Sequence, residues 1–97
     1  MSDRLQIVFG GLAPSLTLAQ AAVVEPRLAE MSPDQILALR DDCRARLQAA
    51  MAAANHEVLG TNDPNALIPV DRADEYCRAF ARHVGDMLIG FVTEVTQ

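Results

Sequence analysis

The chain has 97 residues and a formal net charge of −5, and 51% of its residues are hydrophobic but only 4% are aromatic. This length suits a single helical domain (1–97) with a thin core, because alanine supplies much of the apolar fraction. An acidic surface disfavours direct nucleic-acid binding and suits a protein partner with a basic surface. No run approaches the roughly 18 apolar residues of a membrane span, so we expect a cytoplasmic protein that does not contact a membrane.

Residues 1–14 are predicted to form an extended N-terminal arm. Leu5, Ile7 and Phe9 alternate along the chain with a period near two, and glycine and proline end the run. The arm either lies across the helices or pairs with the same segment of another chain, and we favour the first arrangement. A secretory signal peptide is disfavoured, since the first residues carry no net positive charge.

Residues 15–31 are predicted to form a short, kinked helix capped by Ser15 or Thr17. Leu16, Ala19, Val23 and either Arg27 or Leu28 recur at helical spacing. Pro26 lies inside this pattern, where it removes one N–H donor and crowds the preceding turn. We therefore expect a helix over 15–25 followed by a turn over 26–31.

Residues 32–59 are predicted to form a long amphipathic helix. Ser32 and Gln35 make a capping-box pattern, Pro33 suits the first helical position, and Gly60 suits the position just after the end. The positions expected to face the core share spacings of three and four. They are Ile36, Leu39, Cys43, Leu47, Ala50, Met51, Ala54 and Val58.

Residues 60–70 are predicted to form a loop, because Asn62-Asp63-Pro64-Asn65 is dense in turn-forming residues. We expect Leu67 and Ile68, just before Pro69, to fold back onto the helices.

Residues 71–95 are predicted to form a second long helix with Asp71 as its N-cap and acidic residues in its first turn. We expect Asp74 to pair with Arg78, and Arg82 to pair with Asp86, on the solvent face. The expected core face repeats at helical spacing. Its members are Tyr76, Cys77, Phe80, Val84, Met87, Leu88, Phe91 and Val95.

Together these elements predict an all-α fold of the helical-bundle type, in which two long antiparallel helices carry a short kinked helix and an arm. One copy should leave an apolar surface partly covered, and a homodimer is the simplest way to cover it. The predicted interface residues are small on the first long helix and large near the C-terminal end. They are Ala45, Ala49, Ala52, Leu88, Ile89, Phe91 and Val92.

Four soft ligands are present, namely Cys43, His56, Cys77 and His83. Zinc sites draw paired ligands at short spacing, and no such pair occurs, so we predict no metal and no cofactor. Both cysteines are expected to be buried thiols, although a disulfide between the two helices is conceivable. His83 and Asp86 could orient an imidazole, but such pairs are common on helix surfaces, so we predict no catalytic residue.

The sequence therefore favours a non-enzymatic protein-interaction module, such as an adaptor or regulatory subunit, that forms a homodimer. The main alternative is an acidic protein inhibitor of a nucleic-acid-processing machine, of the anti-CRISPR or anti-restriction type, and the least favoured class is a small enzyme that uses His83 or a cysteine. Small size and negative charge suggest this alternative, and no motif does. A helix-turn-helix is disfavoured because Asp41 and Asp42 would face phosphates.

Overall fold

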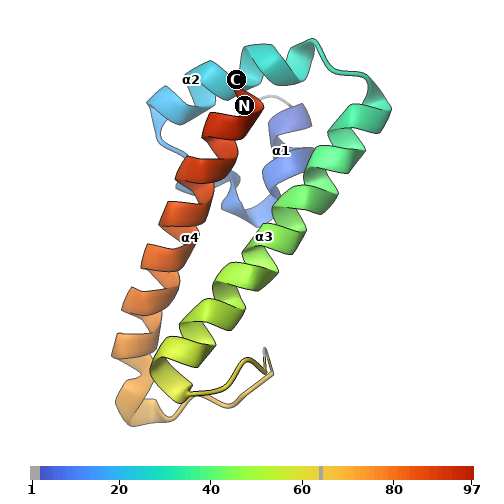
Figure 1. Cartoon of the computed structure of the whole chain (residues 1–97). Coiled ribbons are helices and arrows are strands. Elements are labelled where there is room, and N and C mark those ends of the chain that lie inside the picture. The colour runs from blue at the N-terminus through green and yellow to red at the C-terminus, as the bar shows by residue number, and fades with distance from the viewer. Residues whose placement is uncertain (1–2, 64) are drawn as a thin grey trace. The chain divides into compact units, whose positions relative to one another are not determined.

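The computed structural model describes residues 3–63 and 65–97, and these residues form helices without any strand (Figure 1). The all-α prediction is therefore confirmed for the described part of the chain. In chain order the elements are α1 (Asp3–Phe9), the 3-10 helix η1 (Gly10–Ser15), α2 (Leu18–Ala29), α3 (Pro33–Leu59), the 3-10 helix η2 (Val70–Arg72) and α4 (Ala73–Val95).

The N-termini of α2 and α3 and the C-terminus of α3 show the expected capping interactions. The Ser32 backbone N–H donates to Gln35 Oε1 at 2.8 Å, and the Gln35 N–H donates to Ser32 Oγ at 3.2 Å. Thr17 and Gln20 make the same reciprocal pair at the start of α2. Gly60 follows α3 with a φ of 72°, a backbone conformation that glycine adopts without strain. The predicted boundaries of the first long helix are thus confirmed.

The contacts within the chain define two compact units: unit 1 is Met1–Arg44 with Leu88–Gln97, and unit 2 is Ala45–Met87. In unit 1 the rings of Phe9 and Phe91 meet edge to face, with centroids 5.6 Å apart. Val24 and Leu28 of α2 are fully buried in the same unit. Side chains of α1, α2, the start of α3 and the end of α4 therefore build the core of unit 1.

Unit 2 has a smaller core, made by the second half of α3 and the first half of α4, which lie side by side in Figure 1. Ala54, Val58 and Ala79 are buried together at its centre. Tyr76 and Phe80 pack against them with their rings stacked at 6.1 Å. Because two of the three central residues are alanines, the two helices bury little apolar area per residue in this unit.

Two arginines of unit 1 bind the C-terminal ends of helices. Arg4 Nη1 donates to the Leu28 carbonyl oxygen at 2.6 Å and also to the Met31 carbonyl oxygen. Arg27 donates to the carbonyl oxygens of Val95 and Gln97 at the end of α4. The last carbonyls of a helix have no partner inside the helix, and they form its negative pole. Each arginine therefore satisfies these acceptors and links distant segments of unit 1.

The expected arm over residues 1–14 is wrong for its described part, Asp3 onward, which forms α1 and η1. Leu5, Val8 and Phe9 are buried, and their spacing of three and four places them on one helix face. The alternation of Leu5, Ile7 and Phe9 suggested a strand because it left out Val8, which is also apolar and is buried on the helix face. Ile7, in contrast, remains 44% exposed.

The expected break at Pro26 is also wrong, because α2 continues through it to Ala29. Proline removes the N–H that would donate to the carbonyl of Ala22, and both Ala22 and Pro26 are exposed. Water can reach this carbonyl, so the helix tolerates the missing bond. The predicted face of this helix was one residue out of phase, since Val24 is buried and Val23 is 51% exposed.

The second long helix begins later than predicted. α4 starts at Ala73 after the single turn of η2, so Asp71 does not directly precede its first residue. Arg72 of η2 forms a bidentate ion pair with Glu75, in the first turn of α4, at 3.0–3.2 Å. Tyr76 and Phe80 are half-buried, and Val84, Leu88, Phe91 and Val95 are buried, as expected.

Candidate interaction surfaces

The loop between α3 and α4 exposes a short aliphatic segment, which we call the aliphatic loop segment (residues 67–70). Leu67, Ile68 and Val70 expose 93%, 40% and 94% of their surface. The expectation that Leu67 and Ile68 fold back onto the helices is therefore wrong. Apolar side chains that are adjacent in sequence and exposed together indicate a contact surface.

The start of this loop is fixed to α3 by a buried amide. Asn55 exposes only 2% of its surface, and its Nδ2 donates to the Asp63 carbonyl oxygen at 2.8 Å. The Asp63 side chain accepts in turn from the Asn65 N–H at 2.9 Å, which forms a local turn. Pro69 then has φ −58° and ψ 142°, an extended conformation. The segment thus follows a turn that Asn55 anchors to α3, and its aliphatic side chains are exposed.

The predicted interface residues have mixed environments. Leu88, Phe91 and Val92 are buried within unit 1, at 4%, 0% and 7% exposure, so the expectation that they are only partly covered is wrong. Ile89, beside this buried face on α4, is 60% exposed. The helix turns consecutive residues by about 100°, and this separates Ile89 from its buried neighbours.

The three alanines of the predicted interface lie on α3 within unit 2. Ala45 and Ala49 are exposed and Ala52 is half-buried. They form a row of small side chains that another helix could approach closely. Whether a second copy covers this row stays a prediction.

The two cysteines differ in accessibility. Cys43 is 3% exposed in unit 1, as predicted, whereas Cys77 is exposed on α4 in unit 2, contrary to its predicted place on the core face. Neither cysteine forms a disulfide in the structure. Cys77 follows Tyr76, and one residue of helical rotation carries it from the packed face to solvent.

A charged cluster joins the two helices of unit 2. Glu57 on α3 accepts from Arg82 on α4, and His83 Nε2 lies 3.2 Å from Glu57 Oε1. The Arg82 hydrogen bond, followed by that of His83, holds the pKa of Glu57 below its ordinary value of 4.5. Arg82 and His83 were expected to interact with Asp86, but the structure pairs them with Glu57.

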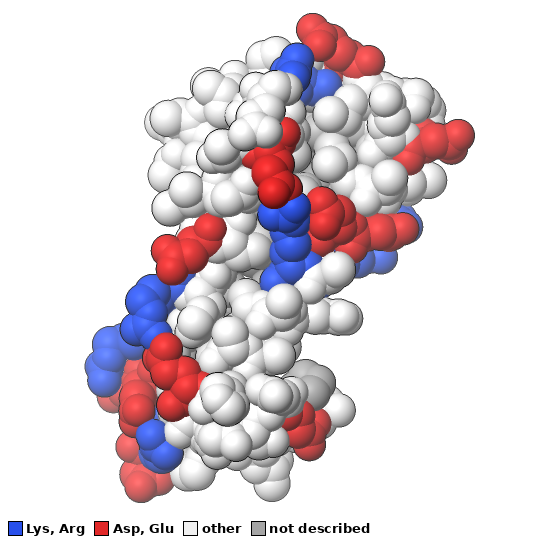
Figure 2. Space-filling view, viewed as in Figure 1, with Lys and Arg blue, Asp and Glu red and all other residues white. Residues whose placement is uncertain are grey.

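No group of three or more His, Cys, Asp or Glu side chains within residues 3–63 and 65–97 is arranged to hold a metal ion. In the same described residues, no helix combines the length and apolar character needed to cross a bilayer. Acidic and arginine side chains lie next to one another on the face shown in Figure 2, so the charge there is mixed.

Comparison of the chain with known protein families, with curated proteins and with solved structures finds no match. The candidate surfaces are therefore defined by the geometry of the chain alone.

The aliphatic loop segment was missed as a site, although the sequence contains a signal for it. Leu67 and Ile68 follow a cluster of turn residues and precede Pro69, which keeps the preceding residue out of a helix. Apolar residues that belong to neither helical pattern have no defined core face to join. Such residues are candidates for an exposed contact.

Proposed function

We propose that the chain is a non-enzymatic protein-interaction module, an adaptor or regulatory subunit, that works as a homodimer. The expected antiparallel pairing of the two long helices serves as its scaffold. The observation that carries the proposal is the exposure of Leu67 and Val70, at 93% and 94%. Burying aliphatic side chains of this size in a partner releases roughly 1.5–3 kcal/mol each.

The partner that suits the aliphatic loop segment is a protein with an apolar cleft and a basic rim. Asp63 and Asp71 flank the segment, both are exposed, and the whole chain carries a net charge of −5. An extended segment that enters a cleft also loses little conformational freedom, because Pro69 already restricts its backbone.

The test compares the wild type with a Leu67→Asn/Val70→Asn double variant in affinity purification from the native host, followed by quantitative mass spectrometry. We expect the double variant to lose the protein that the wild type retains. Leu37→Gln is the matched control, since Leu37 is another exposed aliphatic residue, at 43%, but lies in unit 1. If the double variant and the wild type retain the same protein equally, the proposal for this segment is wrong.

The alternative is an acidic inhibitor that mimics nucleic acid. Such a mimic needs a continuous negative face, whereas Glu57 and Glu75 are each paired with an arginine. This pairing favours the first proposal. Salt separates the two, because binding by charge mimicry weakens steeply as ionic strength rises, whereas burial of Leu67 and Val70 does not.

A further inference from the structure

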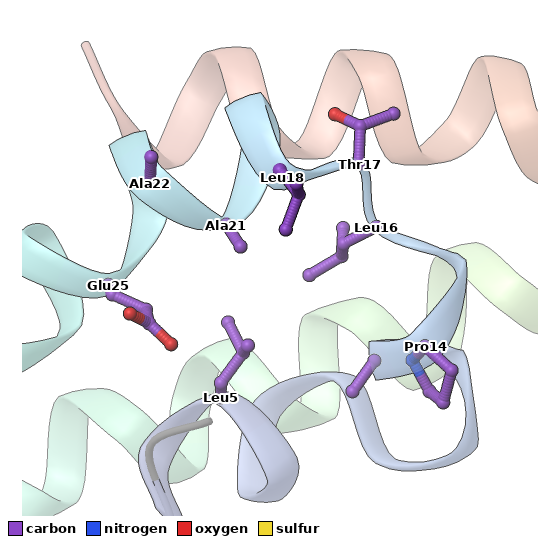
Figure 3. A pocket seen from close by; sticks show the side chains of 9 residues that line it. Leu5, Pro14, Leu16, Thr17, Leu18, Ala21, Ala22 and Glu25 are labelled. Atoms are coloured by element: carbon purple, nitrogen blue, oxygen red, sulfur yellow. The ribbon is translucent and has the colours of Figure 1, made fainter.

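Unit 1 contains an aliphatic pocket of about 500 Å³ where η1 and the first half of α2 meet α1 (Figure 3). Leu5, Leu16, Leu18 and Ala21 line it, and Glu25 lies at one side. All of its lining residues lie between Leu5 and Glu25, so the pocket belongs entirely to unit 1. Its volume falls in the range of about 300–1,000 Å³ that is typical of ligand-binding pockets.

The pocket has a closed floor and an open rim. Leu5 exposes 1% of its surface and forms the inner wall, whereas Leu18 exposes 92% and stands at the opening. In Figure 3 the side chains of Leu5, Leu16 and Leu18 point toward the same central space. This space is therefore large enough to accept a leucine or methionine side chain together with neighbouring groups of a ligand.

Glu25 places a negative charge at one side of the pocket. Its carboxylate points toward the central space in Figure 3, and it is the ionisable group among the lining residues. Glu25 also has an interaction within the chain. A carboxylate can accept about four hydrogen bonds, so a ligand N–H can be added to that interaction. Glu25 is the charged residue among those that line the pocket, so it favours a cationic group in the ligand beside it.

The surface around the pocket indicates a polypeptide ligand. Leu18 is 92% exposed and Val23, further along α2, is 51% exposed. A small molecule inside the pocket would leave Val23, which does not line it, in water, whereas a polypeptide that passes over α2 would cover Val23 as well as Leu18. The net charge of −5 and the carboxylate of Glu25 both favour a basic polypeptide.

We propose that this pocket binds a partner protein by receiving an aliphatic side chain between Leu5 and Leu18, with a neighbouring Arg or Lys of the partner paired to Glu25. The inference rests on the proposed function in taking the ligand to be a protein. It uses a different surface from the aliphatic loop segment, and it specifies the chemistry of the segment that the pocket recognises.

The first test uses three short peptides, acetyl-Leu-Leu-Arg-amide and the same peptide with Gln or Glu in place of Arg. Each is titrated into the ¹⁵N-labelled full chain, and amide shifts are followed by NMR. We expect the largest shifts at Leu16 and Ala21, which line the pocket. The Arg peptide should bind roughly two- to five-fold more tightly than the Gln peptide, the factor that an exposed charge pair supplies. The Glu peptide should bind most weakly.

The second test uses variants of the chain. Glu25→Gln should abolish the preference for Arg over Gln while leaving the Gln peptide bound as before. Glu30→Gln is the matched control, because Glu30 is exposed at the C-cap of α2 and does not line the pocket. It should preserve the preference. Ala21→Phe should fill the space and weaken all three peptides, with helical content checked by circular dichroism.

Equal binding of the three peptides, or an Arg preference that survives in Glu25→Gln, would overturn the proposal. Shifts confined to residues outside the pocket would overturn it as well. These variants leave Leu67 and Val70 unchanged. The peptide titration therefore remains valid if the Leu67→Asn/Val70→Asn variant retains the same partner as the wild type. Equally, the affinity purification remains valid if the three peptides bind without a preference for Arg.

Discussion

At the scale of single residues, side chains at a few positions decide which segments are held together. Arg4 and Arg27 each bind carbonyl groups at the end of a helix that is distant in sequence. Asn55 performs the same task for the loop after α3 through a single bond to Asp63. Asn55 is 2% exposed, and a buried donor that loses its acceptor costs about 1–3 kcal/mol, so this position is as restrictive as a core position.

The two thiols should react with a water-soluble maleimide at very different rates. Cys77 is exposed and should label rapidly in the folded protein, whereas Cys43 is 3% exposed and should label only upon unfolding. Mass spectrometry at timed intervals counts the modified thiols. Cys77→Ser should leave a folded chain that resists labelling, and Cys43→Ser is the reciprocal control. Rapid labelling of the Cys77→Ser variant would show that Cys43 is accessible.

The ion pair of Glu57 should make stability depend on pH in one direction. Its pKa is lower in the folded state than its ordinary value of 4.5, so the folded state favours the ionised form. The stabilisation is present above 4.5 and is lost as pH falls through the lowered pKa. Glu57→Gln should therefore unfold more easily than the wild type in urea at neutral pH, and the difference should narrow as pH falls below 4.5 and through the lowered pKa.

Asp86→Asn is the matched control for this experiment. Asp86 is the partner that helix spacing predicted for Arg82, and it is exposed on the same helix. The structure pairs Arg82 with Glu57 instead, so Asp86→Asn should keep the pH dependence of the wild type. If Asp86→Asn removes that dependence and Glu57→Gln does not, the pairing seen in the structure is wrong.

At the scale of elements, the sequence predicted features that depend on local chemistry and missed those that depend on tertiary contacts. The Ser32 cap, the stop at Gly60 and the core face of α3 arise from neighbouring residues, and all three were predictable. Helix α1 was missed because its helical pattern, Leu5-Val8-Phe9, overlaps a pattern with period two. Its stability depends on contacts such as that of Phe9 with Phe91, which no local rule contains.

The candidate sites were less predictable than the fold for the same reason. Periodicity places Leu88, Phe91 and Val92 on an apolar face, but it does not show whether the chain itself covers that face. The pocket at Leu5 and Leu18 joins separate elements, and it forms only when α1 and α2 come together. Its residues therefore have no signature along the sequence.

The cap of α3 allows a direct test at this scale. Ser32→Ala removes the side-chain acceptor of the Gln35 N–H, and we expect a loss of about 1 kcal/mol in the free energy of unfolding. Urea denaturation followed by circular dichroism measures it. Ser15→Ala is the matched control, because Ser15 ends η1 and does not cap α3. Equal effects of the two substitutions would mean that the capping box contributes nothing specific.

At the scale of the whole molecule, the remaining prediction concerns assembly. The exposed Ala45 and Ala49 form a row on α3 where a second copy can approach closely, and bulk at that row would prevent the approach. The row already lies on a formed helix, so dimerisation through it would not require a change in the backbone conformation of α3. Close packing of small residues therefore predicts an interface that is sensitive to side-chain volume.

Ala49→Arg should convert a dimer into a monomer without loss of helical content, since arginine is itself a good helix former. Light scattering coupled to size-exclusion chromatography measures the mass. Ala81→Arg makes the same substitution at an exposed position of α4, away from the alanine row, and should leave the dimer intact. A wild type that remains monomeric at high micromolar concentration would rule out the homodimer.

The division of the chain also has a consequence for the order of folding. Unit 1 is discontinuous, because it needs both the first segment, Met1–Arg44, and the last, Leu88–Gln97. The contact of Phe9 with Phe91 therefore closes a loop that contains all of unit 2. Closing a long loop is entropically unfavourable, and contacts between distant residues slow folding. Unit 2, whose contacts are closer in sequence, can form first and shorten that loop, so a protein emerging from the ribosome completes unit 1 only after residues 88–97 are released.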